Sequence, residues 1–266
     1  MTPKFQAVVL AAGMGKRMNS DLPKVLHQAL GTPLVHHVLD RLDPLHPERV
    51  ILVVGHKEEL VRASCAPRGV RFVTQSPQLG TGHAVQVAWS EIALAAAEAG
   101  AERVLVLAGD MPLVRTETLR RLLERHAAEG NGVTFLSGTL ADPSGYGRVI
   151  RDGAGRFVKI VEEKDATAEE RAVAEVNSGI YCFDLTPLQD ALASLRTDNK
   201  QKEYYLTDAL SHMRGKGLGV GVEAATHESE LIGVNTTEQL AEVERHLTAA
   251  GFTPRERSAA PGHAER

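Results

Sequence analysis

Short apolar runs alternate with amphipathic stretches through the first half of the chain. The runs are almost continuously apolar, which is typical of strands in a parallel sheet that is covered on both faces. They predict strands over 6–11, 49–54, 70–74, 103–108 and 133–137. The stretches between them predict helices over 33–42, 58–65, 82–99 and 116–129. This alternation predicts an α/β fold with a doubly wound, mostly parallel, Rossmann-like sheet and right-handed crossovers.

The pattern of the second half is different. Two runs, 146–152 and 156–163, flank the turn "GAG" and predict a β-hairpin. We interpret residues 1–140 as one half of a single domain, and residues 141–235 as an insertion-rich half that faces it.

Capping-box pairs, in which a threonine is followed three residues later by Glu or Gln, predict helix starts. Such pairs begin at Thr167, Thr186 and Thr236. Pro187 would occupy the first position of its helix, where proline is well tolerated. The pair at Thr236 predicts a final helix over 236–250, so we expect the domain to span 1–252.

The remaining stretch, 253–266, is polar, contains Pro and Gly and has no periodicity. We expect it to be disordered. No run of hexapeptide repeats indicates a left-handed β-helix, so we expect no domain of that architecture.

Composition excludes several classes of protein. The hydrophobic share of 43% and the charged share of 24% are ordinary for a globular chain, and a net charge of -4 argues against a nucleic-acid partner. No apolar run is long enough to cross a bilayer, and Pro3 and Lys4 interrupt any secretory signal. Cys65 and Cys182 suggest no disulfide framework. We expect a cytoplasmic protein without a membrane partner; the sequence does not predict its oligomeric state.

The first strand is followed by the glycine loop "LAAGMGKRMNSDLPKVLH", residues 10–27. A dinucleotide-binding fingerprint would need a third glycine where Met18 stands. A Walker A loop would need a glycine where Leu10 stands and a hydroxyl residue where Arg17 stands. Neither motif is present.

What remains is a glycine loop at the carboxyl end of the first strand, where ligands bind in open α/β sheets. Gly13 and Gly15 lack Cβ atoms, so their backbone N–H groups can approach phosphate oxygens closely. Arg17 and Lys24 add positive charge suited to phosphoryl transfer. A plain turn before a solvated helix is the alternative.

Further polar residues follow other predicted elements. Asp110 ends the fourth strand and is either a ligand of Mg²⁺ or a helix cap. Gln75 carries an amide that can pair with a pyrimidine edge. Glu162 belongs to the charged run "EEKD", a pattern that is typical of a solvated hairpin end. For His83 we expect a structural hydrogen bond.

The glycine loop resembles the signature of the sugar nucleotidyltransferases, L-A-A-G-x-G-x-R-M followed by P-K. Seven more motifs occur in order: "QLGTGHA", "GDMPL", "GYGR", "IVEEKDAT", "VNSGIY", "EYYLTD" and "GVN". Together they resemble the N-terminal domain of the bacterial N-acetylglucosamine-1-phosphate uridylyltransferases, over residues 5–250. The family's acetyltransferase domain is a left-handed β-helix, and we expect no such domain in this sequence.

The resemblance implies Mg²⁺-dependent formation of UDP-N-acetylglucosamine and pyrophosphate from UTP and N-acetylglucosamine 1-phosphate. It makes 1–140 the nucleotide-binding half and 141–235 the sugar-binding half. Arg17 would neutralise the leaving pyrophosphate and Lys24 the α-phosphate. The first turn and the carboxylate of Asp110 would then converge on one magnesium-bound triphosphate.

The resemblance also assigns the remaining site residues. The implied metal ligands are Asp110 and Asn235. The implied nucleotide-binding residues are Leu10, Ala11, Ala12, Gly13, Gly15, Lys24, Gln75, Gly80, Thr81 and Gly109. The implied sugar-binding residues are Gly147, Glu162, Asn177, Tyr205 and Thr207.

Three positions depart from the family pattern. Lys16 stands where Thr is usual, Ala108 where an aromatic residue is usual, and Lys202 where Gly is usual. Another sugar 1-phosphate or nucleoside triphosphate is therefore an alternative pair of substrates. A non-catalytic sugar-nucleotide-binding protein is the alternative from another class.

Overall fold

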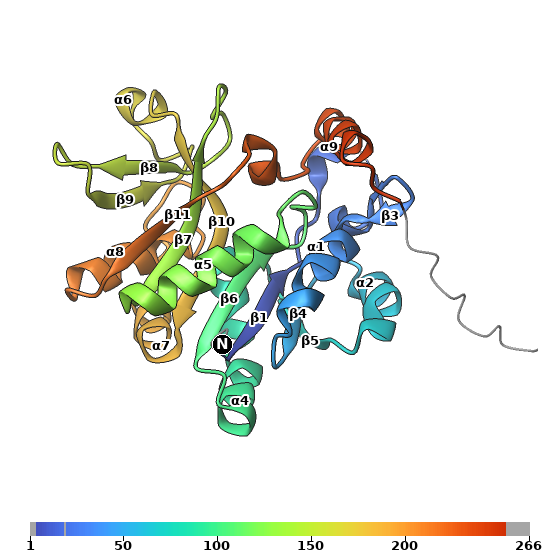
Figure 1. Ribbon diagram of the computed structural model, residues 1–266, viewed down its shortest axis with the longest axis horizontal. Helices are drawn as coiled ribbons and strands as arrows, with labels where there is room; N and C mark the ends of the chain where they lie inside the picture. Colours follow the sequence, from blue (N-terminus) through green and yellow to red (C-terminus); the bar gives the residue numbers. More distant parts are fainter. Residues whose placement is uncertain (1–3, 19, 254–266) are drawn as a thin grey trace, which may run out of the picture.

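The computed structural model describes residues 4–18 and 20–253. Within these residues one nine-stranded sheet forms the centre of the molecule (Figure 1). Its strands are β1 (Phe5–Leu10), β4 (Val50–Val54), β5 (Arg71–Thr74), β6 (Arg103–Ala108), β7 (Val133–Thr139), β8 (Arg148–Arg151), β9 (Phe157–Val161), β10 (Glu175–Asp184) and β11 (Val220–Ala224). The main path runs β11-β7-β10-β6-β1-β4-β5, and the β8–β9 hairpin attaches at β10. A separate pair, β2 (Gln28–Ala29) and β3 (Thr32–Pro33), lies after the first turn.

The prediction of a mostly parallel sheet is confirmed. Strands β6, β1, β4 and β5 run parallel, and β11 runs parallel to β7. The pattern did not predict β10, which is antiparallel to both β6 and β7 and lies between them. The sheet therefore continues from the first half of the chain into the second. The predicted hairpin is confirmed as β8 and β9, which pair antiparallel.

Helices cover both faces of the sheet, as a doubly wound fold requires. The helices are α1 (Leu34–Leu42), α2 (Glu58–Cys65), α3 (Thr81–Val87), α4 (Trp89–Ala99), α5 (Thr116–Glu129), α6 (Ala168–Arg171), α7 (Leu185–Ser194), α8 (Thr207–Gly215) and α9 (Thr237–Ala249). Ala7 and Val9 of β1 share a core with α1, α2 and α5. Val8 faces the other way, into a core with α3, α4, α7 and α8. The alternation along one strand thus separates two apolar layers.

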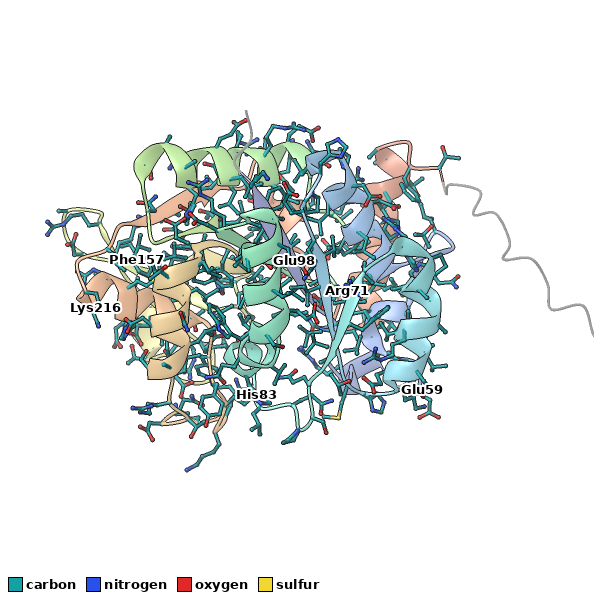
Figure 2. The ribbon with its side chains drawn as sticks, turned by 90° about the horizontal axis from the view of Figure 1, so that it is seen from below. Glu59, Arg71, His83, Glu98, Phe157 and Lys216 are labelled. Atoms are coloured by element: carbon teal, nitrogen blue, oxygen red, sulfur yellow. The ribbon has the colours of Figure 1, made fainter. Side chains whose placement is uncertain are left out.

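The strand β9 and the helix α2 lie at opposite ends of the molecule. In Figure 2, Phe157 of β9 and Lys216 lie at one end, and Glu59 of α2 lies at the other. The final helix α9 returns to the first half, where the carboxylate of Glu244 accepts a hydrogen bond from the backbone N–H of Leu30 at 3.0 Å. This return places the segment before α9 against the first turn. Among the described helices, none is both long and apolar enough to span a membrane.

Two local predictions are wrong. The single helix expected over 82–99 is two helices, α3 and α4, which meet at Ala88. The pattern could not reveal the break because apolar positions continue through it and are buried on both sides. The capping box expected at Thr186 is also absent, because α7 begins at Leu185, two residues before the expected start at Pro187, and its N-cap is Asp184.

The other two capping predictions fare better. Thr167 forms the full capping box with Glu170. Thr236 accepts from the backbone N–H of Gln239 as predicted, but the Gln239 side chain accepts from the N–H of Asn235 at 2.8 Å. The predicted tail, 253–266, lies outside the described residues apart from Thr253.

Candidate functional site

The loops after β1 and β6 meet at the carboxyl edge of the sheet. The two strands are parallel neighbours with Leu10 opposite Ala108. The N–H of Gly109 donates to the carbonyl of Leu10 at 2.9 Å. A Cβ atom on Gly109 would lie 3.1 Å from that carbonyl oxygen, so the close approach of the two loops favours glycine here.

Lys24, Asp110 and Asn235 form the centre of this edge. The ammonium group of Lys24 forms an ion pair with the carboxylate of Asp110, which is only 8% exposed. It also donates to Oδ1 of Asn235 at 3.0 Å. The N–H of Val234 donates to the carbonyl of Asp110 at 2.9 Å, which holds the "GVN" segment beside it. The first turn and the end of β6, the fourth strand that the sequence predicts, therefore converge as expected.

The donor set of this centre suits a hard divalent cation. A carboxylate oxygen and an amide oxygen already contact one positive charge, the ammonium group of Lys24. Among the described residues, no group of three or more His, Cys, Asp or Glu side chains could hold a metal. Two protein oxygens, with phosphates and water completing the shell, are the usual way in which Mg²⁺ is bound. Asp110 and Asn235 are thus suitable ligands for a metal that arrives with a polyphosphate.

A cleft of about 380 Å³ opens on one side of Asp110. Seven of the ten predicted nucleotide-binding residues line it: Leu10, Ala12, Gly13, Lys24, Gln75, Gly80 and Thr81. Gln75 is buried, and its amide donates to the carbonyl of Gly80 at 2.9 Å and contacts Nδ1 of His83 at 3.2 Å. His83 thus makes the structural hydrogen bond expected of it.

The other three predicted nucleotide residues do not line this cleft. Ala11 is buried and its N–H donates to the carbonyl of Val53 at 2.8 Å. Gly109 acts through its close contact with the loop after β1. Gly15 lines a small cleft of about 140 Å³ together with Gly13, Arg17, Lys24 and Asn235.

A second cleft, of about 340 Å³, opens on the other side of Asp110. Three predicted sugar-binding residues, Gly147, Glu162 and Asn177, line it. It also includes Arg17 and Asn235. The two clefts share Thr81, Ala108 and Asp110, so they adjoin at the centre of the site.

The segment Tyr204–Thr207 joins the two clefts. Its even-numbered residues bind the "QLGTG" loop. The N–H of Tyr204 donates to the carbonyl of Leu79, and its carbonyl accepts from the N–H of Gly82, each at 2.8 Å. The N–H of Leu206 donates to Thr81 Oγ1 at 3.1 Å. Its odd-numbered residues hold the hairpin side. Tyr205 donates to Asp165 and Thr207 to Glu162, each at 3.0 Å.

The structure does not bring Tyr205 and Thr207 into the second cleft. Both line a further cleft with Asp165 and Asp208, on the other side of Glu162. Thr207 reaches the second cleft only through its hydrogen bond to Glu162, and Tyr205 contacts Asp165 instead. Their direct contact with a sugar stays a prediction.

Several lining residues were missed by sequence reasoning. Gln78 and Glu203 line the first cleft, and Tyr146 and Tyr181 the second. Their positions inside or beside the motifs "QLGTG", "EYYLTD", "GYGR" and "VNSGIY" are the signal that could have identified them. Of the departures from the family pattern, Ala108 lies at the junction of both clefts, while the side chain of Lys16 lies outside the described part.

Burial changes the acidity of Glu162. Desolvation raises the pKa of its carboxyl group, the hydrogen bond from Thr207 opposes this, and the charge of Asp208 adds to the rise. A raised carboxyl pKa in the folded state stabilises the fold below the unfolded value of 4.5, and this contribution is lost as pH rises through the folded pKa. The ionised Glu162 is therefore a source of instability at neutral pH.

We expect Glu162→Gln to raise the melting temperature at pH 7, and the gain to shrink as pH falls toward 4.5. A pH series of thermal melts measures this. Glu175→Gln is the control of opposite sign: burial would raise the pKa of Glu175, but bonds from Arg151 and Ser137 outweigh it and lower that pKa. That variant should melt lower at neutral pH. A lower melting temperature for Glu162→Gln at pH 7 would contradict the assignment.

Gly15 holds the position of Lys24. It has a φ of +63°, and a Cβ atom there would lie 2.8 Å from Cβ of Lys24. We expect Gly15→Ala to displace Lys24 and to lower turnover by about 10-fold or more, because misplaced catalytic groups lose positioning. Gly155→Ala is the matched control, with a φ of +76° and no atom within 4 Å of the new Cβ. Equal loss of activity in both variants would show that backbone strain alone is responsible.

The sheet order and the paired clefts at its carboxyl edge define a nucleotidyltransferase fold. A solved structure, a putative glucose-1-phosphate thymidylyltransferase from Bacillus anthracis in complex with a sucrose, superposes with a TM-score of 0.73. It is 18% identical and the match covers 94% of this chain and 98% of that one. The model of the MobA-like NTP transferase domain matches residues 7–172, and the chain belongs to this family.

Curated relatives resemble the chain more closely in sequence. The bifunctional protein GlmU of Dechloromonas aromatica (strain RCB) is 48% identical over 246 residues, which is 92% of this chain and 52% of that protein. The bifunctional protein GlmU of Paraburkholderia xenovorans (strain LB400) is 49% identical over 238 residues, or 90% of this chain and 51% of that protein. The chain spans about half the length of the curated relatives it matches.

Proposed function

We propose that this chain is a Mg²⁺-dependent uridylyltransferase that forms UDP-N-acetylglucosamine and pyrophosphate from UTP and N-acetylglucosamine 1-phosphate. The observation that carries the proposal is the convergence of Lys24, Asp110 and Asn235 where the two clefts adjoin. A triphosphate in the first cleft and a sugar phosphate in the second would meet at that point. The similarity to proteins named GlmU supports the choice of substrates.

The reaction needs positioning and charge neutralisation rather than a general base. The sugar phosphate is already an anion, and its oxygen attacks the α-phosphorus of UTP in line while pyrophosphate leaves. Lys24 stabilises charge at the α-phosphate and Arg17, in the small cleft, at the leaving pyrophosphate. Mg²⁺ on Asp110 and Asn235 supplies charge neutralisation when it is bound.

Recognition of the two substrates falls to the two clefts. The amide nitrogen of Gln75 is occupied by Gly80, so we propose that its oxygen accepts from the N3–H group of uracil. Glu162 accepts from sugar hydroxyls, and the Thr207 hydroxyl orients it. The N–H of Gly147 and the amide of Asn177 complete the sugar site. These substrates imply a cytoplasmic reaction.

A panel of substrates tests the proposal. Each of several nucleoside triphosphates is combined with each of several sugar 1-phosphates, with and without Mg²⁺, and pyrophosphate release is followed. UTP with N-acetylglucosamine 1-phosphate should give the highest kcat/KM, and only with the metal. A higher kcat/KM for another pair would reassign the substrates. Binding of UDP-sugar without pyrophosphate from any pair would indicate a non-catalytic protein.

A further inference from the structure

Arg148 is a fully buried arginine behind the second cleft. It begins β8, and only 2% of its surface is exposed. One guanidinium nitrogen, Nη2, lies 2.8 Å from Oε2 of Glu163, and the other, Nη1, donates to the carbonyl of Tyr146. Among the described atoms, Nε has no hydrogen-bond partner. Removing a guanidinium group from water costs free energy, which an ion pair and hydrogen bonds of good geometry must offset.

The contacts of this arginine fix one loop. The same carboxylate oxygen of Glu163 that pairs with Arg148 accepts from the N–H of Gly145 at 3.2 Å. The ion pair thus holds both the N–H of Gly145 and the carbonyl of Tyr146. Burial would raise the pKa of Glu163, but the bonds from Arg148 and Gly145 outweigh it and lower that pKa, so the carboxylate stays charged.

The loop that is held in this way forms a wall of the second cleft. Residues 144–147 all line it, together with Glu162 and Asn177. The loop carries a glycine on each side of Tyr146, and Gly145 has a φ of +85°, so its sequence allows many backbone conformations. Two backbone hydrogen bonds also hold it: the N–H of Tyr146 donates to the carbonyl of Pro143 at 3.2 Å, and that of Asn177 to the carbonyl of Gly147 at 2.9 Å. Gly147 lies beside Glu162, because a Cβ atom there would lie 3.5 Å from Oε2 of that residue.

We propose that Arg148 is a positioning residue: through Glu163 it fixes loop 144–147 in the conformation that receives the sugar phosphate. This inference rests on the proposed function, and it concerns a residue that touches neither cleft. Arginine suits the task because its planar guanidinium group offers two donors in a fixed geometry, here one to a carboxylate and one to a carbonyl. Lysine, with a single charged nitrogen on a flexible chain, cannot make both contacts in that geometry.

Kinetics of Arg148→Lys and Glu163→Gln test the proposal. Each should raise KM for the sugar phosphate by about 10-fold, as expected for the loss of a charge-assisted hydrogen bond, and leave KM for the nucleotide within about 2-fold. Arg151→Lys is the matched control. Arg151 lies on the same strand and binds Glu175 at 2.6 Å, but neither residue lines the second cleft. Its kinetics should not change.

A double variant separates positioning from stability. Arg148→Met with Glu163→Leu replaces both charged side chains by apolar ones, so that neither charge is left without its partner. We expect its melting temperature to exceed that of Arg148→Met alone, while KM for the sugar phosphate stays high. Recovery of both properties would overturn the proposal, because the pair would then serve stability alone. So would an equal rise of KM for both substrates in the single variants.

Hydrogen exchange gives a readout that does not depend on activity. Amides of residues 144–147 should exchange faster in Arg148→Lys and Glu163→Gln, while those of 79–87 keep the wild-type rate. Unchanged exchange at 144–147 would overturn the proposal even if the wild-type enzyme proved inactive. A wild-type protein that releases no pyrophosphate from any pair, with the exchange effect present, would refute the function and support the loop-fixing role.

Discussion

Asp110→Asn should lower turnover by about 10³-fold or more and leave the fold intact, because a phosphoryl-transfer site depends on its charged groups. The substitution keeps the shape of the side chain and the backbone bond from Val234. It removes the negative charge that pairs with Lys24, which is also that of the carboxylate proposed to bind the metal. Pyrophosphate release at saturating Mg²⁺ and a thermal melt measure the two parts of the prediction.

The control for Asp110 is another ion-paired aspartate. Asp40 lies on α1 and forms an ion pair with Arg68 at 2.7 Å. It lines neither of the two clefts that adjoin at Asp110. Asp40→Asn should retain wild-type turnover. If Asp110→Asn also retained it, Asp110 would be a structural residue and the proposed metal site would be wrong.

The elements around the site could be predicted from the sequence because local pattern determines them. The apolar runs before the glycine loop and before Asp110 became β1 and β6, and parallel pairing then brings their carboxyl ends to one edge. The close contact between Gly109 and Leu10 follows from that pairing. For this part, strand periodicity and one rule of α/β topology suffice.

The rest depends on contacts between distant segments. Nothing in the pattern of 175–184 shows that β10 enters the sheet antiparallel between β6 and β7. The hydrogen bonds of residues 205–207 join segments that are far apart in the sequence: Leu206 contacts Thr81, whereas Tyr205 and Thr207 contact Asp165 and Glu162. The family resemblance predicts that Tyr205 binds the sugar, and the pattern alone could not show that its hydroxyl group donates to Asp165.

Buried charge is also hard to read from sequence. Arg148 in "GYGR" could be a phosphate ligand, a solvated residue or a buried partner of Glu163, and only the fold distinguishes these. The same holds for Glu162, which the run "EEKD" also presents as a solvated residue, whereas desolvation raises its pKa. The sequence identifies the charged side chains, but only tertiary packing determines whether each of them is solvated, buried or paired.

Lys24→Gln should change two measurements in opposite directions. Turnover should fall by about 10²-fold to 10³-fold, because the α-phosphate loses its cation. The affinity of the free protein for Mn²⁺, used as a spectroscopic probe, should rise. The reason is that the ammonium group of Lys24 contacts both Asp110 and Asn235, the two proposed ligands, and so competes with a metal ion when no nucleotide is present.

A Mn²⁺ titration followed by electron paramagnetic resonance, without nucleotide, measures that affinity. Lys159→Gln is the control, since Lys159 pairs with Glu170 at 2.8 Å and lines neither cleft at Asp110. It should leave both turnover and Mn²⁺ affinity unchanged. A Lys24→Gln protein with weaker or equal Mn²⁺ binding would contradict the competition, and with it the assignment of Asp110 and Asn235 as a shared cation site. The opposite signs matter, because damage to the fold would lower both quantities together, whereas removing a competing cation can lower one and raise the other.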